Sequence, residues 1–394
     1  MMTALDPETP VLHPDMGDNL AFRRLHEQGD VDETFRTAHK VVSARFVTGR
    51  HTGVTLEPRS ILVDWNPAEE QMTAWHATQA PHMIQTVLAT HLDLPESRVR
   101  VICEDVGGSY GIKVHVYPDE MATAAIAKIM KRPVKFIADR LESFSSDIHA
   151  RDHEIEAKIA VGEDGRILAM DVDDWTAIGP YSVYPRTSAI EGNQVVNLCG
   201  GPYDFQNYRA RTTVVFQNKT PTCQYRAVGH PIAVAITEGL VDMAAAEIGM
   251  DPVEIRRRNM FRDDAYPVTS PANMRFEGLS HHASMDKLLE LMDYDGLRAE
   301  QAELREKGIY RGIGIASFIE LTNPSPFMYG IGGARISAQD GCTVRMDPDG
   351  SIVALSGVTE QGQGTEAMLS QVVAEGLGVS PARVRVITGD TQVT

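Results

Sequence analysis

The sequence predicts an α+β fold in which helices cover mixed sheets, and the main observation behind this prediction is a unit that occurs twice. Residues 91–105 and 376–390 both contain Arg-Val-Arg-Val-Ile at the same place within the segment. In each copy a helical stretch precedes this strand and begins at a Gln-containing loop. Other segments alternate apolar and polar residues over strand lengths. Two related units predict a pseudo-symmetric protein that holds one ligand between its halves.

An alternative is that Arg-Val-Arg-Val-Ile is an amphipathic strand sequence that arose twice. The helix and the turn before the strand recur as well, which favours a true repeat. The two helix-opening loops are residues 78–81 and 361–366. A helix N-terminus has unpaired N–H groups and a partial positive charge, so these loops suit an anionic or carbonyl-rich ligand.

Composition narrows the class of protein. The chain has 394 residues, enough for two or three domains, and a hydrophobic content of 43%, which is ordinary for a globular protein. A net charge of −17 without a basic run argues against binding nucleic acid or anionic lipid. No stretch approaches the roughly 18 apolar residues that a membrane span needs.

The N-terminus and the cysteines predict a cytoplasmic protein with free thiols. Residues 1–7 lack the basic start and apolar core of a signal peptide. The cysteines are scattered without any Cys-x-x-Cys pair, which predicts no iron–sulfur cluster and no zinc site of the usual spacing in this chain. They are Cys103, Cys199, Cys223 and Cys342.

In chain order, residues 1–40 read as a polar entry segment that ends in a short amphipathic helix at 30–39. Strands are predicted at 41–47, 60–65 and 71–76, where apolar and polar residues alternate. A helix begins at Pro81, because the missing N–H of proline costs nothing in a first helical turn. The first repeated strand, a glycine-rich loop, a helix at 119–130 and a strand at 134–138 follow.

Residues 151–178 predict two strands around the turn at 163–166. The Gly-, Pro- and Tyr-rich stretch 179–208 has no predicted element, and a strand at 211–217 leads to a helix at 232–248. Asp251 is the expected cap of the next helix, whose basic triplet 256–258 we expect to face solvent. Helices at 284–293 and 295–307 precede strands at 313–319, 343–346 and 351–355. We therefore predict a first domain at 1–265, a helical linker at 266–310 and the start of a second domain at 311–394.

The glycine-rich loop is a candidate ligand-binding segment, because glycine lets a backbone approach a ligand closely. It follows neither the Gly-x-Gly-x-x-Gly nor the Walker pattern, so its spacing argues against a nucleotide site. The alternative is a tight strand-to-helix turn. The candidate residues are Gly107, Gly108, Ser109, Tyr110 and Gly111.

The second Gln-containing loop offers two amides and two glycines at a helix start, which suits a heterocyclic ligand. The alternative is a polar helix cap. These residues are Gln361, Gly362, Gln363 and Gly364.

Arg226 follows a predicted strand among small residues, where an arginine can clamp an oxyanion or phosphate. The alternative is a surface ion pair. His230, His281 and His282 belong to no metal-spaced set, and we interpret them as ordinary histidines. Glu320 is either a buried base or, our preferred interpretation, a strand-end carboxylate.

Together these motifs resemble the molybdenum-cofactor-binding large subunit of the molybdenum hydroxylases, the family of xanthine dehydrogenase, aldehyde oxidase and carbon monoxide dehydrogenase. The resemblance covers essentially the whole chain, as the central segment of such a subunit, and implies that the domains at 1–265 and 311–394 are pseudo-repeated cofactor-binding domains. It rests on the order and spacing of Thr78-Gln79, residues 107–113, Tyr225-Arg226 with Gly229, residues 254–259 and residues 360–364.

The resemblance also implies residue roles. Gln79 would hydrogen-bond an oxo ligand of molybdenum, and the loop around residues 108–111 would line the metal and the pterin, with Tyr110 where the family usually has Phe. Arg226 would lie beside the metal, and residues 361–364 would hold the pterin or the dinucleotide part. No residue of this chain is predicted as a metal ligand.

The implied activity is hydroxylation of an electron-poor carbon with oxygen from water, on an aldehyde or an N-heteroaromatic substrate. The cofactor would be a molybdenum–pterin, either alone or as a dinucleotide. Because the chain has no predicted iron–sulfur or flavin site, the electrons would leave through an iron–sulfur subunit and an FAD subunit of a hetero-oligomer.

Three departures from the family pattern matter. The family's catalytic glutamate is expected beyond Thr394, so the chain reads as a fragment, a truncated product or half of a split subunit. Carbon monoxide enzymes have Cys-Ser-Phe-Arg after Tyr-Arg, whereas here Ala227, Val228 and Gly229 follow, which argues against a copper site and CO oxidation. Purine-oxidising members have Glu where this chain has Val114, which weakens a xanthine assignment.

Two other functions stay open at this stage. One is a non-catalytic cofactor-domain fragment or scaffold that needs a partner chain for activity. The other is a nucleotide-binding hydrolase, which the absent phosphate motifs disfavour. For the substrate, Phe327 and Tyr329 are candidates for stacking on an aromatic ring.

Overall fold

The structure, a computed structural model, describes residues 1–320 and 340–394. Its largest sheet has the strand order β1-β11-β10-β9-β2. β10 and β11 are parallel, whereas the other neighbours are antiparallel. The turn predicted at 163–166 joins β9 to β10, and Gly165 in it has a φ of +80°. The strands are β1 (Leu20–Gln28), β2 (Lys40–Thr48), β9 (His153–Val161), β10 (Ile167–Ala177) and β11 (Asn207–Val215).

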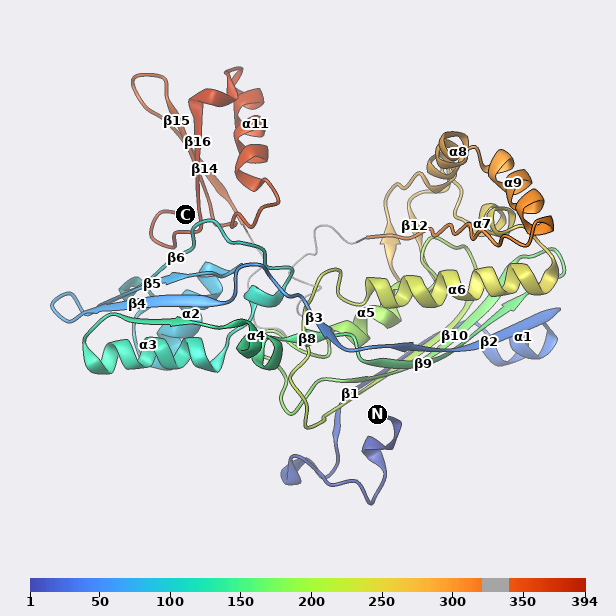
Figure 1. The fold of residues 1–394 in the computed structure, drawn as a ribbon, viewed down its shortest axis with the longest axis horizontal. Coiled ribbons are helices and arrows are strands. Elements are labelled where there is room, and N and C mark those ends of the chain that lie inside the picture. The colour runs from blue at the N-terminus through green and yellow to red at the C-terminus, as the bar shows by residue number, and fades with distance from the viewer. Residues whose placement is uncertain (321–339) are drawn as a thin grey trace.

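Helices cover this sheet because its strands bury apolar side chains such as Ile159 and Val172. α5 and α6 pack on one face and α1 on the other, and the helices α7 to α9 follow beyond α6 (Figure 1). Ile236 and Leu240 of α6 and Met285 of α8 belong to the same core. These helices are α1 (Val31–Thr37), α5 (Ile190–Leu198), α6 (His230–Ile248), α7 (Pro252–Asn259), α8 (His281–Met292) and α9 (Tyr294–Glu306).

A second sheet has the order β6-β5-β4-β7, with β5 and β6 parallel. α2 and α3 bury one of its faces against Ile61, Val63 and Val101. On the other face Trp75 and Ile137 are exposed. The elements are β4 (Ser60–Asn66), β5 (Gln71–His76), α2 (Pro81–Leu92), β6 (Val99–Ile102), α3 (Pro118–Met130), β7 (Val134–Ile137) and α4 (Arg140–Ser146).

The C-terminal unit is a three-stranded sheet with one helix: β14 (Cys342–Met346), β15 (Ile352–Ser356), α11 (Thr365–Leu377) and β16 (Val384–Thr388). Its small core joins Ile352 and Ala354 to Ala374 and Val384. The remaining short strands are β3 (His51–Thr52), β8 (His149–Ala150), β12 (Val268–Thr269) and β13 (Arg275–Phe276). The 3-10 helices are η1 (Met2–Leu5), η2 (Pro14–Met16), η3 (Glu96–Arg98), η4 (Ile112–Val114) and η5 (Pro381–Arg383).

The repeated sequence unit is a repeated structural unit. In the first copy β4 is antiparallel to β5, and α2 and η3 connect β5 to the parallel strand β6. In the second copy β14 is antiparallel to β15, and α11 and η5 connect β15 to the parallel strand β16. The repeat therefore extends two strands further toward the N-terminus than the sequence alone indicates.

The two copies meet where their last strands end, which places the C-terminal unit beside the second sheet (Figure 1). The N–H of Cys103 donates to the carbonyl of Gly389 over 2.8 Å. Arg100 and Asp390 form a two-bond ion pair, with Nε–Oδ1 at 3.0 Å and Nη2–Oδ2 at 2.5 Å. This junction fixes the loops that follow β6 against the loop that precedes α11.

Four expectations from the sequence are wrong. Part of the predicted entry segment is β1, an edge strand of the large sheet, and α5 lies inside the stretch 179–208. Residues 313–319 form no strand, because no described segment pairs with them. Arg256 of the basic triplet is fully buried and pairs with Glu238 and Asp242 instead of facing solvent.

Among the described residues, no helix is both long and apolar enough to cross a membrane.

Candidate functional site

An open cavity of about 470 Å³ lies where the loops of both copies and the start of α6 meet. We call it the central cavity. It unites seven of the residues singled out in the sequence, which are Gln79, Ser109, Tyr110, Gly111, Arg226, Gln361 and Gln363. Gly108, Gly362 and Gly364 do not line it but directly adjoin residues that do, and Gly107 lies one position further away along the chain. Its remaining lining residues are Gln224, Tyr225 and Val228.

Gln79 is tied to the glycine-rich loop, residues 107–113. Its Oε1 accepts hydrogen bonds from the hydroxyl of Ser109 and, over 2.9 Å, from the N–H of Gly111. Its own N–H donates to the carbonyl of Lys113 over 3.0 Å. Because Oε1 is used within the loop, the Nε2 donor is the side-chain group of Gln79 that remains for a ligand.

The glycine-rich loop needs glycine at position 111 for two reasons. Its φ of +94° is a conformation that only glycine adopts without strain. A Cβ there would also lie 2.8 Å from the carbonyl oxygen of Gln224 and 3.1 Å from the Cα of Tyr225. This close approach lets the N–H of Arg226 donate to the carbonyl of Tyr110 over 2.8 Å. Two walls of the central cavity are thus joined.

Glu57 and Lys113 brace the same loop from behind. One carboxylate oxygen of Glu57 accepts from the N–H of Gly107 over 2.7 Å and from Nζ of Lys113 over 2.6 Å. The side chain of Lys113 is fully buried. Burial lowers the pKa of Lys113 below its ordinary value, and the Glu57 carboxylate opposes that shift. Lys113 ends the motif at 107–113, but its contact with Glu57 was not predicted, because 56 positions separate the two residues.

Arg226 is exposed on the wall of the central cavity, and its guanidinium lies 5.8 Å from the ring centre of Tyr110. Among residues 1–320 and 340–394 it forms no ion pair. No carboxylate lines the central cavity in this part of the chain either. The guanidinium is therefore available to an anionic or oxygen-rich ligand, as a cation that a bidentate oxyanion fits.

The loop before α11 uses its backbone donors internally, contrary to the expectation that they are free. The Glu360 carboxylate accepts from the N–H groups of Gly362, Gly364 and Glu366 at 2.9, 3.0 and 3.1 Å. Burial raises the pKa of Glu360, but these hydrogen bonds outweigh it and lower the pKa overall. Nε2 of Gln363 donates to the carbonyl of Thr359, and Nε2 of Gln361 donates to the hydroxyl of Thr359. Oε1 of Gln361 is therefore the amide group of this loop that is left for a ligand.

The donor set of the central cavity fits a phosphorylated heterocycle. The guanidinium of Arg226, Nε2 of Gln79 and the half-exposed Tyr110 hydroxyl can donate, and Oε1 of Gln361 can accept. Open space lies where Gly362 and Gly364 would carry a Cβ, so a ligand can approach the bare backbone there. One cation without a lining carboxylate suits a ligand that carries oxyanions.

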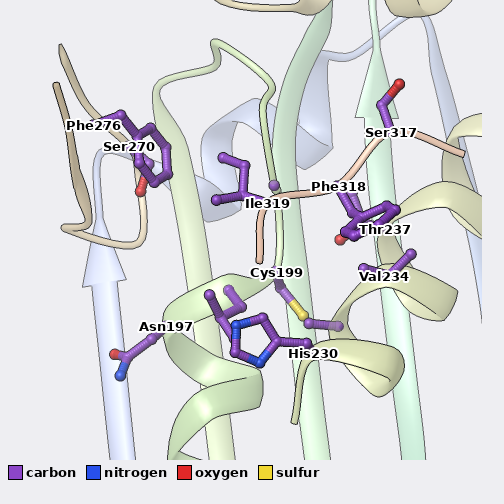
Figure 2. A pocket seen from close by; sticks show the side chains of 13 residues that line it. Asn197, Cys199, His230, Val234, Thr237, Ser270, Phe276, Ser317, Phe318 and Ile319 are labelled. Atoms are coloured by element: carbon purple, nitrogen blue, oxygen red, sulfur yellow. The ribbon is translucent and has the colours of Figure 1, made fainter. Parts of the chain in front are cut away.

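A second, enclosed cavity of about 20 Å³ lies behind the first turn of α6, between His230, Cys199, Phe276 and Phe318 (Figure 2). A volume of this size holds about one water molecule and no organic ligand. His281 and His282 lie at the start of α8. Glu320 is exposed, so it is not a buried base. Phe327 and Tyr329 lie outside the described residues.

Comparison with known proteins adds a family to this geometry. Residues 12–260 match the family model of a molybdopterin cofactor-binding domain, and residues 287–394 match a second model of that description. The nicotine 6-hydroxylase large subunit of Paenarthrobacter nicotinovorans is 34% identical over 381 residues, which cover 96% of this chain and 46% of that relative. The carbon monoxide dehydrogenase large chain of Hydrogenophaga pseudoflava is 30% identical over 410 residues, covering 98% and 50%.

A solved structure of a similar protein has the same fold. Quinoline 2-oxidoreductase from Pseudomonas putida 86 superimposes with a TM-score of 0.93 at 30% sequence identity, over 100% of this chain and 50% of that one. The chain spans about half the length of the curated relatives it matches.

Proposed function

The chain belongs to the molybdopterin-binding large subunits of the xanthine oxidase family, and from this premise we propose that it contributes the cofactor site of a molybdenum hydroxylase. The observation that carries the proposal is the central cavity, in which the Gln-containing loops of both copies face the glycine-rich loop and Arg226. Loops from both copies around one cavity can contact a single extended cofactor at separate points along its length.

When bound, the molybdenum–pterin supplies the chemistry that oxidises a carbon with oxygen from water. In this proposal Nε2 of Gln79 donates to an oxygen of the cofactor, and Arg226 holds an oxyanion beside it. The glycine-rich loop lines the cavity through Ser109, Tyr110 and Gly111, and the cofactor approaches the bare backbone at Gly362 and Gly364. Residues 361–364 hold the pterin or its dinucleotide extension.

For the substrate we propose an N-heteroaromatic compound. Nicotine 6-hydroxylase and quinoline 2-oxidoreductase, which are among the similar proteins, are named for such rings. Ala227, Val228 and Gly229 stand where carbon monoxide enzymes have Cys-Ser-Phe-Arg, which argues against CO as the substrate. We further propose iron–sulfur and FAD subunits as the electron-accepting partners.

The test is purification of the chain from its native host with the chains that co-purify. Molybdenum, pterin, iron and flavin are quantified, and turnover is assayed with nicotine, nicotinate, quinoline and benzaldehyde in ¹⁸O-labelled water. We expect stoichiometric molybdenum and labelled hydroxylation of at least one heteroaromatic. Oxidation of benzaldehyde alone would contradict the proposed substrate class. A folded, cofactor-free complex would favour a scaffold.

A further inference from the structure

Four buried charged side chains form a row behind the wall of the central cavity. Glu191 of α5 accepts from the N–H of Arg151 over 2.9 Å and also from its guanidinium. On its other side Glu191 lies 3.7 Å from Nε2 of His153. Nδ1 of His153 donates to Asp174 over 2.6 Å. All four side chains are less than one-tenth exposed. We call Arg151, Glu191, His153 and Asp174 the charge row.

The charge row alternates in sign and is neutral as a whole. Burial alone would lower the pKa of His153, but the carboxylates of Asp174 and Glu191 outweigh burial and raise this pKa to about 10. Burial would raise the pKa of Glu191, but His153 and Arg151 outweigh it and lower this pKa to about 2. His153 and Glu191 are therefore both charged at neutral pH, and each lies beside a group of opposite charge.

The row reaches the site through one residue. The Nη2 of Arg151 donates to the carbonyl of Arg226 over 2.6 Å, and its Nη1 donates to the carbonyl of Tyr225 over 3.3 Å. On the opposite side the N–H of Arg226 is bonded to the glycine-rich loop at Tyr110. The backbone of Arg226 is thus fastened from two directions, while its side chain stays free at the cavity wall.

The backbone around residues 225–229 has unusual conformations that bring it close to Arg151 and α5. Arg151 and Ala227 both have left-handed backbones, with φ of +67° and +63°. Gly229 lies so close to α5 that a Cβ would be 2.8 Å from the carbonyl of Glu191. Such strained backbones persist where the surroundings over-determine them, and they cluster at functional sites.

Stability alone does not explain the charge row, because apolar side chains of similar volume often stabilise a core as well as a buried ion pair does. The planar fork of arginine is suited to collect a carboxylate and two carbonyls at once, which no apolar residue can do.

We propose that Arg151 is a positioning residue that fixes the backbone of residues 225–227, so that Arg226 is directed at the ligand of the central cavity. Glu191 holds Arg151, and the His153–Asp174 pair completes the row so that no buried charge is left uncompensated. The identity of the ligand rests on the proposed function, whereas the fastening of the loop does not.

The test compares two variants with a matched control. The double variant Arg151→Met/Glu191→Gln removes one charge of each sign, so the His153–Asp174 pair stays neutral while the two carbonyls lose their donor. Arg151→Lys keeps the positive charge but lacks the planar guanidinium with its several donors. If the double variant does not fold, this single variant still allows the measurement. Asp152→Asn is the control, because Asp152 directly follows Arg151 but forms its ion pairs with Arg50 and Lys219, neither of which lines the central cavity.

Two measurements are made on the purified complex. The first is amide hydrogen exchange of the peptide containing residues 224–230, in protein from molybdate-starved cells so that bound metal does not differ. The second is molybdenum content after growth with molybdate. We expect exchange at Arg226 to rise about tenfold in both variants, the factor for roughly one lost hydrogen bond, and molybdenum content to fall at least about twofold. Asp152→Asn should match wild type in both.

Wild-type exchange in both variants would overturn the proposal, even if molybdenum content fell. Faster exchange across the whole large sheet, beyond that of the control, would also overturn it, because the row would then only stabilise the fold. If the wild-type complex itself holds no molybdenum, the proposed function fails while the exchange measurement still decides the positioning role.

Discussion

At the scale of single residues, the proposed cofactor site depends most on Arg226. Its side chain is exposed on the cavity wall, and its backbone is held by Tyr110 and Arg151. We expect Arg226→Ala to lower kcat/KM about 100-fold, because loss of one oriented donor in an active site typically costs 10²–10³. The melting temperature should change by no more than about 2 °C, since surface substitutions rarely alter stability.

The control for this variant is Arg45→Ala, which removes an exposed arginine that pairs with Glu154 on the large sheet. Steady-state kinetics and thermal unfolding of both variants make the comparison. Full activity of Arg226→Ala, or a loss equal to that of Arg45→Ala, would remove Arg226 from the site.

His153 gives a prediction about pH. Its pKa is about 10 in the folded protein and about 6.5 when unfolded. Because the pKa is higher in the folded protein, protonated His153 stabilises the fold fully at a pH below the unfolded-state pKa. This stabilisation is lost as the pH rises through the folded-state pKa. The unfolding free energy of wild type relative to His153→Asn should therefore shrink between pH 7 and 9, by up to about 1.4 kcal/mol per pH unit.

His115 is the matched control, because burial lowers its pKa to about 3 and it is neutral throughout this range. The contribution of His115 to the unfolding free energy falls only when the pH drops below about 6.5, where the histidine of the unfolded chain becomes protonated. Denaturant unfolding at several pH values measures both differences. A difference for His153→Asn that stays flat from pH 7 to 9 would mean that His153 is not held as a cation.

At the scale of elements, the glycine-rich loop makes the sharpest prediction. We expect Gly111→Ala to lower molybdenum content and to destabilise the protein about 2 kcal/mol more than Gly17→Ala, since its Cβ would clash with the backbone at Gln224. Gly17 has a similar φ of +83° with nothing within 4 Å of its Cβ, so it isolates the strain of the dihedral angle. Equal unfolding free energies for the two variants would contradict the close approach.

Several elements could not be predicted, because the periodic pattern of apolar and polar residues arises only in a helix or strand that has one face in solvent and the other in the core. α5 is buried on nearly every face and contains glycine and asparagine, so it has no amphipathic period. β1 is a charged edge strand whose one neighbour among residues 1–320 and 340–394 is β11. In contrast, β2, β4, β5 and the helices α2 and α6 follow their patterns, because each has one face in the core.

Some of the candidate site residues could be predicted from the sequence and others could not. Gln79, residues 109–111 and Arg226 lie in short motifs whose chemistry is visible locally. Glu57, Arg151 and Glu191 act on those motifs across long sequence separations, and an isolated Glu or Arg carries no local signal. Tyr225 belongs to the Tyr225-Arg226 motif that the sequence showed, whereas Gln224 directly precedes that motif, and this position is the signal that could have indicated it.

At the scale of the whole molecule, the junction between the two copies holds the central cavity together. We expect Asp390→Asn to weaken the ion pair with Arg100 and to speed hydrogen exchange at Cys103 and Thr391, whose N–H groups cross the junction, by about fivefold. Asp347→Asn, which alters an exposed ion pair within the C-terminal unit, should leave both amides unchanged. Identical exchange in the two variants would show that the junction does not depend on this ion pair.

The central claim is that residues from both copies bind one molybdenum–pterin. Its most direct test is the molybdenum and pterin content of three complexes from the native host: wild type, Gln79→Ala and Gln361→Ala. We expect stoichiometric molybdenum and pterin in wild type and a clear loss of both in each variant. Folded wild-type complex without molybdenum, or full cofactor content in either variant, would contradict it.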